Sequence, residues 1–531
     1  MNGPVAHGSS VESPSGRSLA ALALLAGMIL CPGCMTRESL YGQLAASRTR
    51  AYSNWHRARS QEAPGPAVLK GKLGLQDAIK LALVHNKTLQ AALEDKEIAR
   101  GGIVEAYAEA LPTISLVGNY TLLDRVGSFK VGGRSISLGE VHSYSVDLQV
   151  RQPLFRGGAI GAAIRAARLY AALTDEQVRG QVQQTIFEAA AAYFDMLLAQ
   201  QLYQVNEQAV KSAEAQLRDV QTKQRAGVAS QYDVLRAQVD VSNFRAEMIQ
   251  QRNRINLART RLLKTMGVSQ DSRIELADQL EYHPIRPVLE EAVRLAATNR
   301  PDLFQAELGI RLQQEALRIA KSRYWPQVDA TFTEGWARPN PHFSMVDNWG
   351  DRWMAGVTVE IPLFDGLRRE GRLIQEKAAL KQQRILLLDT QERALLEIRQ
   401  ALLSLRDAEE LVDSQRLNLK RAAEGLRLAE VNYREGVSTT VAVTDARAAL
   451  TRARGLYYQA IYAHTTARLA LQRAMGILGP RAGQAAAPKQ PAVRPARIEE
   501  FEQPHGAPPA RQPTTRPAAE QQPPRKEKED R

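Results

Sequence analysis

The sequence has few of the residues from which metal sites, disulfide frameworks and compact enzyme cores are built. Cys31 and Cys34 are the only cysteines among 531 residues, so the rest of the chain can hold no disulfide and no cysteine-based metal site. Aromatic residues make up 6%, which is typical of extended helices rather than of a rounded core. The eight histidines are scattered, with none at metal-ligand spacing. We predict no catalytic residues, no metal site and no cofactor.

Two features that would indicate phosphate or nucleic-acid binding are incomplete. The glycine-rich segment 127–135 has Gly133 where a phosphate-binding loop needs lysine, and it lies between predicted strands rather than before a helix. We expect an extracellular hairpin loop there. The net charge of +13 comes from arginines spread between glutamates along helical segments, not from one basic patch. Nucleic acid is therefore not an expected partner.

The chain lacks any apolar run long enough for a transmembrane helix. Arg17 precedes an apolar run over residues 19–30, which suits a signal peptide at residues 1–33. The run ends in Pro-Gly-Cys34, which resembles a bacterial lipoprotein processing site, although Cys31 stands where leucine is usual. We predict lipidation of Cys34; the alternative is ordinary cleavage nearby with an unmodified cysteine. If the chain spans a membrane, it must use strands.

The chain is internally duplicated. Residues 75–82 return as 289–296, an offset of 214, whereas three later marks return at an offset of 209. These marks are Pro153-Leu154-Phe155 with Pro362-Leu363-Phe364, Gly227-Val228 with Gly436-Val437, and Met266-Gly267 with Met475-Gly476. The length change falls within 113–152 against 327–361. Because surface loops absorb insertions and rigid helices do not, these stretches should contain the loops.

The constant stretches read as long coiled-coil helices. Six large residues from Ile398 to Tyr433 recur every seven positions, and small residues follow most of them by three positions. We predict long helices at 156–226 and 365–435, of about 110 Å, and shorter helices at 230–266 and 439–475. The first repeat then covers 75–267 and the second 289–476. We expect residues 34–74 to form a lipid-anchored or equatorial segment, 268–288 a linker, and 477–531 a disordered tail.

The variable stretches alternate with period two. Apolar Tyr144, Val146, Leu148 and Val150 are interleaved with polar residues, and the same pattern recurs before Ile361. This alternation predicts strand pairs at 113–152 and 327–361, each near the length of a membrane barrel strand. A soluble sandwich edge alternates too, but the position between two very long helices favours a barrel.

This order of elements resembles the TolC-like outer-membrane factors, from about residue 75 to 478. The residues that carry the resemblance are Asn299-Arg300-Pro301-Asp302-Leu303, Trp325-Pro326, Pro362-Leu363-Phe364-Asp365-Gly366 and Tyr433-Arg434-Glu435-Gly436-Val437. The resemblance implies a mainly α fold with a membrane β-barrel. It implies a homotrimer with a twelve-stranded barrel, four strands per chain, and a coiled-coil tunnel reaching into the periplasm. It also implies a passive efflux conduit that docks a periplasmic adaptor and an inner-membrane pump of RND, ABC or MFS type.

The resemblance further implies a gate at the periplasmic tip, where Gly227-Val228 and Gly436-Val437 form the helix turns. Asp445 matches an acidic ring that narrows the pore. Asp233 matches the acid of a closing link, Ser438 replaces its arginine, and Tyr433 matches a tyrosine of the same network. Arg434 is a candidate substitute for the missing cation. The alternative is that Asp233 and Asp445 only stabilise helix starts.

Two other classes remain as alternatives. A periplasmic adaptor also carries coiled-coil hairpins, but it should have a glycine-rich sandwich beside a single hairpin, whereas the helices here are duplicated. A purely structural coiled-coil scaffold would not need the paired amphipathic strands. The sequence therefore favours a membrane channel over both.

Overall fold

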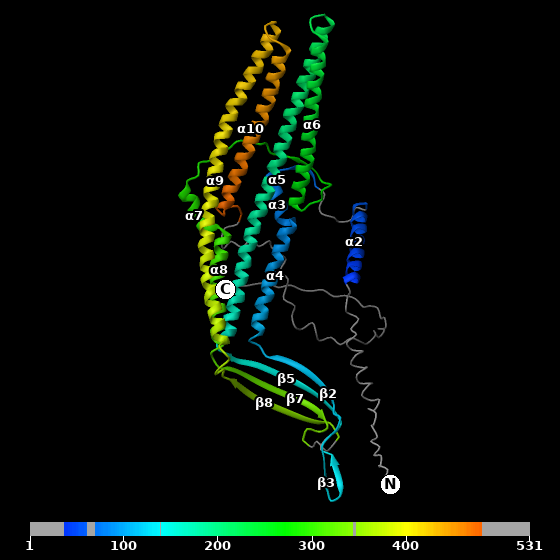
Figure 1. Cartoon of the computed structure of the whole chain (residues 1–531), viewed down its shortest axis with the longest axis vertical. Coiled ribbons are helices and arrows are strands. Elements are labelled where there is room, and N and C mark those ends of the chain that lie inside the picture. Colours follow the sequence, from blue (N-terminus) through cyan, green and yellow to red (C-terminus); the bar gives the residue numbers. More distant parts are fainter. Residues whose placement is uncertain (1–36, 61–68, 138–139, 343–346, 480–531) are drawn as a thin grey trace, which may run out of the picture. The chain divides into compact units, whose positions relative to one another are not determined.

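The structure is a computed structural model, and it describes residues 37–60, 69–137, 140–342 and 347–479 (Figure 1). The expected signal peptide, Cys34 and nearly all of the expected tail lie outside these residues. Among the described residues, no helix is both long enough and apolar enough to cross a lipid bilayer. Helix α2 spans Arg37–Ser60.

The helices of the two halves correspond in length and position. Helices α3 (Leu75–His85) and α7 (Leu289–Asn299) have 11 residues each, and α4 (Lys87–Ala108) and α8 (Pro301–Ser322) have 22 each. Helices α5 (Ala159–Arg225) and α9 (Arg368–Arg434) have 67 residues each, and α6 (Gln231–Met266) and α10 (Thr440–Ala474) have 36 and 35. The first two pairs begin 214 residues apart and the last two begin 209 apart, as the repeat requires.

Each 67-residue helix is accompanied along its length by two shorter ones. In Figure 1, α6 lies along one half of α5 and α4 along the other, while α10 and α8 accompany α9 in the same way. At about 1.5 Å per residue the long helices extend roughly 100 Å. The heptad positions Ile398, Leu405 and Val412 of α9 are buried, as are Met196 and Val210 of α5. The coiled-coil seam read from the sequence is therefore the packed face.

A glycine permits the junction between the two short helices of the first half. Gly267 ends α6 with a φ of 70°, and a Cβ there would lie 2.0 Å from the carbonyl oxygen of His85. At this junction the Asn86 amide donates to the carbonyl of Thr265 at 2.8 Å, while its oxygen accepts the amide of Leu89 and caps α4. Asn86 thus joins the end of α6 to the start of α4.

The second half builds the same junction with different chemistry. Gly476 has a φ of 70° and abuts the backbone of Arg300. The buried Arg300 guanidinium donates to the carbonyl of Ala474 and forms ion pairs of 2.7 Å with Asp302 and Glu397. Because Arg300 is buried, these partners are needed to satisfy its charge.

Four long strands form one antiparallel sheet in the order β2–β5–β7–β8. They span Thr113–Leu122, His142–Arg156, Gln327–Arg338 and Gly350–Glu360. The register places the alternating apolar residues on one face, although Glu334, Arg338 and Asp351 are charged exceptions. This face includes Ile114, Leu116, Tyr120, Leu122, Tyr144, Val146, Leu148, Val150, Val328, Ala330, Phe332, Trp336, Trp353, Ala355, Val357 and Val359.

The opposite face of this sheet is polar and carries ion pairs between strands. Asp147 of β5 is buried and binds Arg352 of β8 at 3.0 Å. Asp329 of β7 accepts from Arg151 at 3.1 Å and from Arg156 at 2.7 Å. These ion pairs between strands thus lie on one face, and most of the apolar groups lie on the other.

The remaining strands form two smaller, two-stranded sheets. Strands β1 (Lys70–Leu73) and β6 (Arg273–Leu276) pair in parallel. Strands β3 (Ser128–Val131) and β4 (Arg134–Ser137) form a hairpin, so the glycine-rich segment expected as a loop is itself largely strand. Its two-residue turn places Gly132 and Gly133 at positive φ, the conformation that such tight hairpins need.

The crowding at the α6–α4 junction gives a stability prediction. Gly227 and Gly267 have similar positive φ values, but a Cβ at Gly227 would meet nothing within 4 Å. Gly227→Ala should therefore cost only the left-handed strain, about 1–2 kcal/mol. Gly267→Ala must also displace the His85 carbonyl, so we expect it to lower the thermal unfolding midpoint at least about twice as much. Equal midpoints for the two variants would contradict the close junction.

Candidate functional site at the helix turns

The two turns that join the long and short helices have the same backbone geometry. Gly227 and Gly436 have φ values of 74° and 76°. The amide of Val228 donates to the carbonyl of Lys223, and that of Val437 to the carbonyl of Asn432, both at 2.9 Å. The Gly227 amide donates to the carbonyl of Gln224, and the Gly436 amide donates to that of Tyr433. Together these hydrogen bonds form the Schellman motif that ends a helix. Val228 and Val437 remain exposed at 75% and 80%.

The helices after the turns begin differently in the two halves. Ser230 caps α6 in a capping box: its hydroxyl accepts from the amide of Asp233 at 3.2 Å, and the Asp233 carboxylate accepts the amide of Ser230 at 2.9 Å. The Ser230 hydroxyl also donates to the Asp233 carboxylate at 2.6 Å, and this hydrogen bond together with the one from the Ser230 amide lowers the pKa of Asp233. Thr439 caps α10, but Ala442 stands where the box needs an acid. Asp233 thus stabilises the start of α6 as the acid of its capping box.

The tips of the two halves touch through Lys223 and Tyr433. The Lys223 ammonium of α5 lies 3.9 Å from the centre of the Tyr433 ring of α9, and Asp219 binds it at 3.0 Å. Burial alone would lower the pKa of Lys223, but Tyr433 and Asp219 outweigh burial and raise it. Lys223 therefore stays charged, as a cation–π contact requires.

The other residues predicted for the closing network make contacts within their own half. The Ser438 amide donates to the carbonyl of Asn432 at 3.2 Å. Arg434 donates to the carbonyl of Glu430, one turn earlier in α9. Glu430 also binds Arg447 of α10 at 3.1 Å, which ties the second hairpin together. Neither Ser438 nor Arg434 is brought to Asp233 by a contact between the described residues.

Asp445 lies near a second polar contact between the halves. It is exposed in the second turn of α10. Asp240 of α6 and Thr444 of α10 lie beside it and line one small cavity with Arg447. Burial raises the pKa of Asp240, the Thr444 hydroxyl opposes that rise, and the charge of Asp445 adds to it. Asp445 therefore acts on a carboxylate of the other half.

Sequence reasoning does not identify Lys223 or Asp240. Lys223 corresponds to Asn432 in the other half, so the repeat gives no signal for it. Asp240 looks like an ordinary exposed residue of a polar helix. Both become visible only when the two hairpins are placed side by side, because their partners Tyr433 and Thr444 are about 200 residues away.

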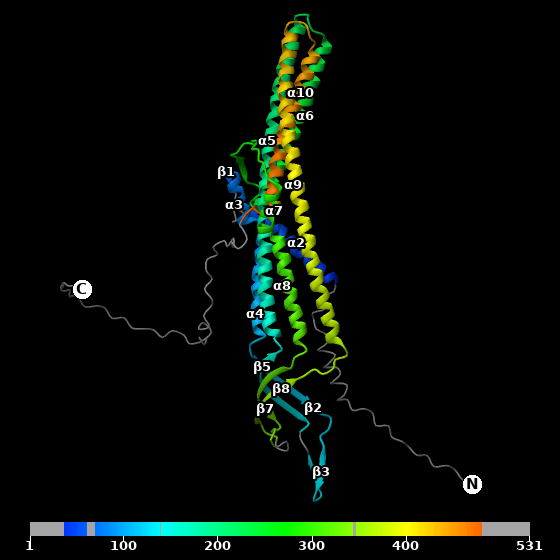
Figure 2. The same cartoon turned by 90° about the vertical axis from the view of Figure 1, so that its left-hand side faces the viewer.

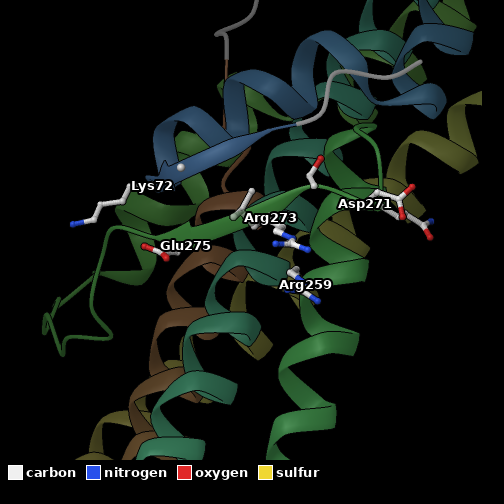
Figure 3. Close-up of a pocket in the computed structure, with 9 residues that line it drawn as sticks. Lys72, Arg259, Asp271, Arg273 and Glu275 are labelled. Carbon is white, nitrogen blue, oxygen red and sulfur yellow. The ribbon is translucent and has the colours of Figure 1, made fainter. Parts of the chain in front are cut away.

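A cavity of about 600 Å³ lies beside the small sheet of β1 and β6 (Figure 3). Lys72, Arg259, Asp271, Arg273 and Glu275 line it, so charges of both signs surround it. In the figure Lys72 and Glu275 extend to one side, whereas Arg259 and Arg273 lie close together. Within the described part of the chain, no three His, Cys, Asp or Glu side chains are grouped to hold a metal.

Comparison with known proteins identifies the family. A model of the outer membrane efflux protein family matches residues 78–268 and 292–477, one segment in each half. Protein CyaE of Bordetella pertussis is 26% identical over 388 residues, covering 70% of this chain and 76% of that protein. The toluene efflux pump outer membrane protein TtgC of Pseudomonas putida is 22% identical, covering 76% and 82%. The cobalt-zinc-cadmium resistance protein CzcC of Cupriavidus metallidurans is 27% identical over 316 residues, covering 58% and 67%.

Solved structures share the fold. The outer membrane protein VceC from Vibrio cholerae has a TM-score of 0.64 at 19% identity and covers 76% of this chain and 96% of its own. The open state of the MtrE outer membrane channel of Neisseria gonorrhoeae has a TM-score of 0.62 at 20% identity, covering 76% and 89%. At these identities the likeness concerns the fold alone. The mainly helical, duplicated architecture is therefore one known from outer membrane channels.

Proposed function

The chain belongs to the outer membrane efflux protein family, and we propose that three copies of it form a passive channel through which an inner-membrane pump exports its substrates. The observation that carries this proposal is that each layer of the chain has four elements and two open edges. Such a layer can be completed by copies of itself arranged in a ring.

The sheet and both helical layers each have two edges that lack a partner among the described residues. The sheet has the order β2–β5–β7–β8, so β2 and β8 each lack a partner on one side within the described residues. Beside the sheet the helices follow the order α4–α5–α8–α9, and nearer the turns α6–α5–α10–α9. Figure 2, turned by 90°, shows α5, α6, α9 and α10 overlapping near the turns, whereas α4, α8 and α9 spread apart toward the sheet. Elements of the first half form one edge, and α9 and β8 form the other.

The open sheet edges support closure in a membrane. Lipid offers no hydrogen-bond partners, so strand edges within it must pair. Trp353, Val357 and Val359 on the apolar face are 69%, 64% and 56% exposed in one chain, which suits contact with lipid. The face with Asp147, Arg352 and Asp329 would then line the lumen. Four strands from each of three copies would give the twelve-stranded barrel that the family resemblance implies.

The relatives indicate the kind of assembly. TtgC is named for toluene efflux and CzcC for cobalt-zinc-cadmium resistance, so relatives of this chain are named for unlike compounds. We propose that this chain likewise takes its substrate from its pump, of RND, ABC or MFS type, through a periplasmic adaptor. The mixed charges of its polar sheet face suit such an unselective conduit. A lipid on Cys34 would add an anchor in the outer membrane.

At the turns we propose a gate. The Lys223–Tyr433 contact would hold the two hairpins of one chain together, and three copies of Asp445 would surround the axis of the closed tip. Asp233 supports the start of α6 through its capping box with Ser230 rather than through an arginine. The closing contact in this chain is therefore a lysine on an aromatic ring.

The lipid-facing side of the sheet can be tested with one substitution on each face. Val357 and Met354 are both exposed residues of β8, 64% and 67%, on opposite faces. Val357→Arg should cost roughly 2–4 kcal/mol if it lies near the bilayer midplane, so assembled protein in the outer-membrane fraction should fall. Met354→Arg points into the lumen and should assemble normally. Equal losses from both variants would count against the channel.

The tip contact can be tested by single-channel recording. An exposed cation–π contact is worth about 0.5–1 kcal/mol, and three copies act together, so losing them should raise the open fraction roughly tenfold or more. We expect this increase for Tyr433→Leu. Tyr433→Phe keeps the ring and loses only the hydroxyl, so its open fraction should rise less than that of Tyr433→Leu. An unchanged open fraction in Tyr433→Leu would remove Tyr433 from the gate.

The proposed Asp445 ring predicts block by cations. Like charges around one axis repel, and a multivalent cation among them relieves the repulsion. Divalent or trivalent cations added on the periplasmic side should reduce conductance, and Asp445→Ala should weaken this block. Asp233→Ala removes a carboxylate that is bound to Ser230, so it should retain the block. Undiminished block in Asp445→Ala would leave Asp445 a helix-start carboxylate only.

A further inference from the structure

We propose that a cavity between α5 and α8 binds the phosphate group of a membrane phospholipid. This inference rests on the proposed placement of the sheet in the membrane, and it adds a ligand that the channel would hold at the membrane edge. The cavity has a volume of about 430 Å³. The polar residues that line it are Arg165 and Arg168 of α5 and Arg311, Gln314 and Glu315 of α8. Three arginines thus surround one cavity with one carboxylate.

The carboxylate of this cavity is already bound by arginines of the chain. Glu315 is buried, and it accepts from Arg165 of α5 at 3.0 Å and from Arg318, which is one turn later in α8. A buried carboxylate needs such partners, so these two arginines hold Glu315 in place. Because two arginines share one carboxylate, one of their two positive charges is left over.

Arg168 and Arg311 add positive charge that no carboxylate of the described residues binds. Arg168 donates to the phenol oxygen of Tyr107 in α4, and its guanidinium carbon lies 5.6 Å from the centre of that ring. Arg311 forms no side-chain hydrogen bond or ion pair in the described part of the chain, although Glu307 is one turn earlier in α8. The four arginines around Glu315 therefore leave three positive charges without a counter-charge.

The donors of this cavity suit a phosphate ester. A guanidinium group presents its N–H donors in a planar fork that matches the oxygens of phosphate. The Gln314 amide at the same cavity is a further donor. The oxygens of a phosphate group point in several directions, so one group can accept from Arg168 on α5 and from Arg311 on α8 together. Its negative charge would also relieve the repulsion between these arginines.

The place of the cavity in the fold favours a lipid as the source of the phosphate. Arg165 is close to the start of α5, which follows β5, and Arg318 is close to the end of α8, which precedes β7. Both residues lie within roughly 10 Å of these helix ends. If the sheet spans the hydrocarbon, this level is that of the headgroups. Because α5 and α8 are the two middle helices of the layer α4–α5–α8–α9, neighbouring copies at its edges would leave the cavity uncovered.

Apolar side chains lead from the arginines toward the sheet. Arg311, Arg318 and Trp325 recur every seven residues, so they lie along one face of α8 and of the turn that continues it. Trp325 is 59% exposed, and Leu111, four residues after Tyr107, is 60% exposed. Tryptophan is the residue that membrane proteins place at the interface between headgroups and hydrocarbon. A phospholipid offers both a phosphate for the cavity and hydrocarbon for these side chains, whereas a free phosphate offers only the first.

Lipid binding to the purified full chain, measured by native mass spectrometry with added phosphatidylglycerol, tests the site. Arg311→Gln removes a charged donor and should weaken binding roughly tenfold, whereas Arg311→Lys keeps the charge and should lose less. Arg311 makes no side-chain contact that folding needs, so both variants should keep the unmodified thermal unfolding midpoint. The matched control is Arg252→Gln, which changes an exposed arginine of α6, along the half of α5 away from the sheet. It should bind like the unmodified protein.

Two further probes separate the phosphate from the hydrocarbon of the lipid. Diacylglycerol has the same chains but no phosphate, so it should not displace phosphatidylglycerol. Glycerol 3-phosphate has the phosphate but no chains, so it should displace the lipid only at much higher concentration. Trp325→Ala should weaken the binding of phosphatidylglycerol and leave that of glycerol 3-phosphate unchanged.

The possible outcomes separate this inference from the proposed channel. Weaker lipid binding in Arg311→Gln and Trp325→Ala, but not in Arg252→Gln, supports the inference. Equal lipid binding by Arg311→Gln and the unmodified protein overturns the site and leaves the channel standing. Displacement by glycerol 3-phosphate at the concentration of the lipid, with no effect of Trp325→Ala, overturns the lipid as the source and leaves a site for a free phosphate ester. An unmodified chain that is absent from the outer-membrane fraction overturns both proposals.

Discussion

A strand edge cannot be left unpaired in the hydrocarbon of a bilayer, and the proposed assembly depends on that constraint. The described sheet has two free edges and one exposed apolar face. One chain cannot satisfy its own edge strands if it lies in lipid. Under the proposal, closure must come from other copies, and the helices attached to the strands must then follow the same ring. This is why the edges of the helical layers coincide with the edges of the sheet.

Because the chain is duplicated, each copy would contribute two similar units to such a ring. The two 67-residue helices have equal length, and each is matched by two shorter helices that meet at a glycine. The two halves solve this junction with unlike residues, an asparagine in one and a buried arginine in the other. Backbone geometry is thus preserved between the halves while side-chain chemistry has diverged. The tip shows the same divergence, because Asp233 completes a capping box for which Ala442 has no carboxylate.

The sequence predicts the parts of this structure that are periodic or repeated. The alternation around Val146 and Val357 and the seam through Leu405 are local patterns, and the structure places their residues on the faces expected. The family resemblance is confirmed by the family match. The contact of Lys223 with Tyr433 could not be predicted, because no local pattern places two distant hairpins in register. The β3–β4 hairpin was hidden by a glycine-rich composition that also suits a loop. The roles of Asp445 and Cys34 remain predictions.

The central claim is that one chain is an incomplete layer that copies of itself complete. Native mass spectrometry of the full chain, extracted from outer membranes in mild detergent, measures this most directly. The account predicts a complex that consists of three copies of the chain and no other protein. A monomer, a dimer, or a complex in which a different protein covers the open edges would contradict it.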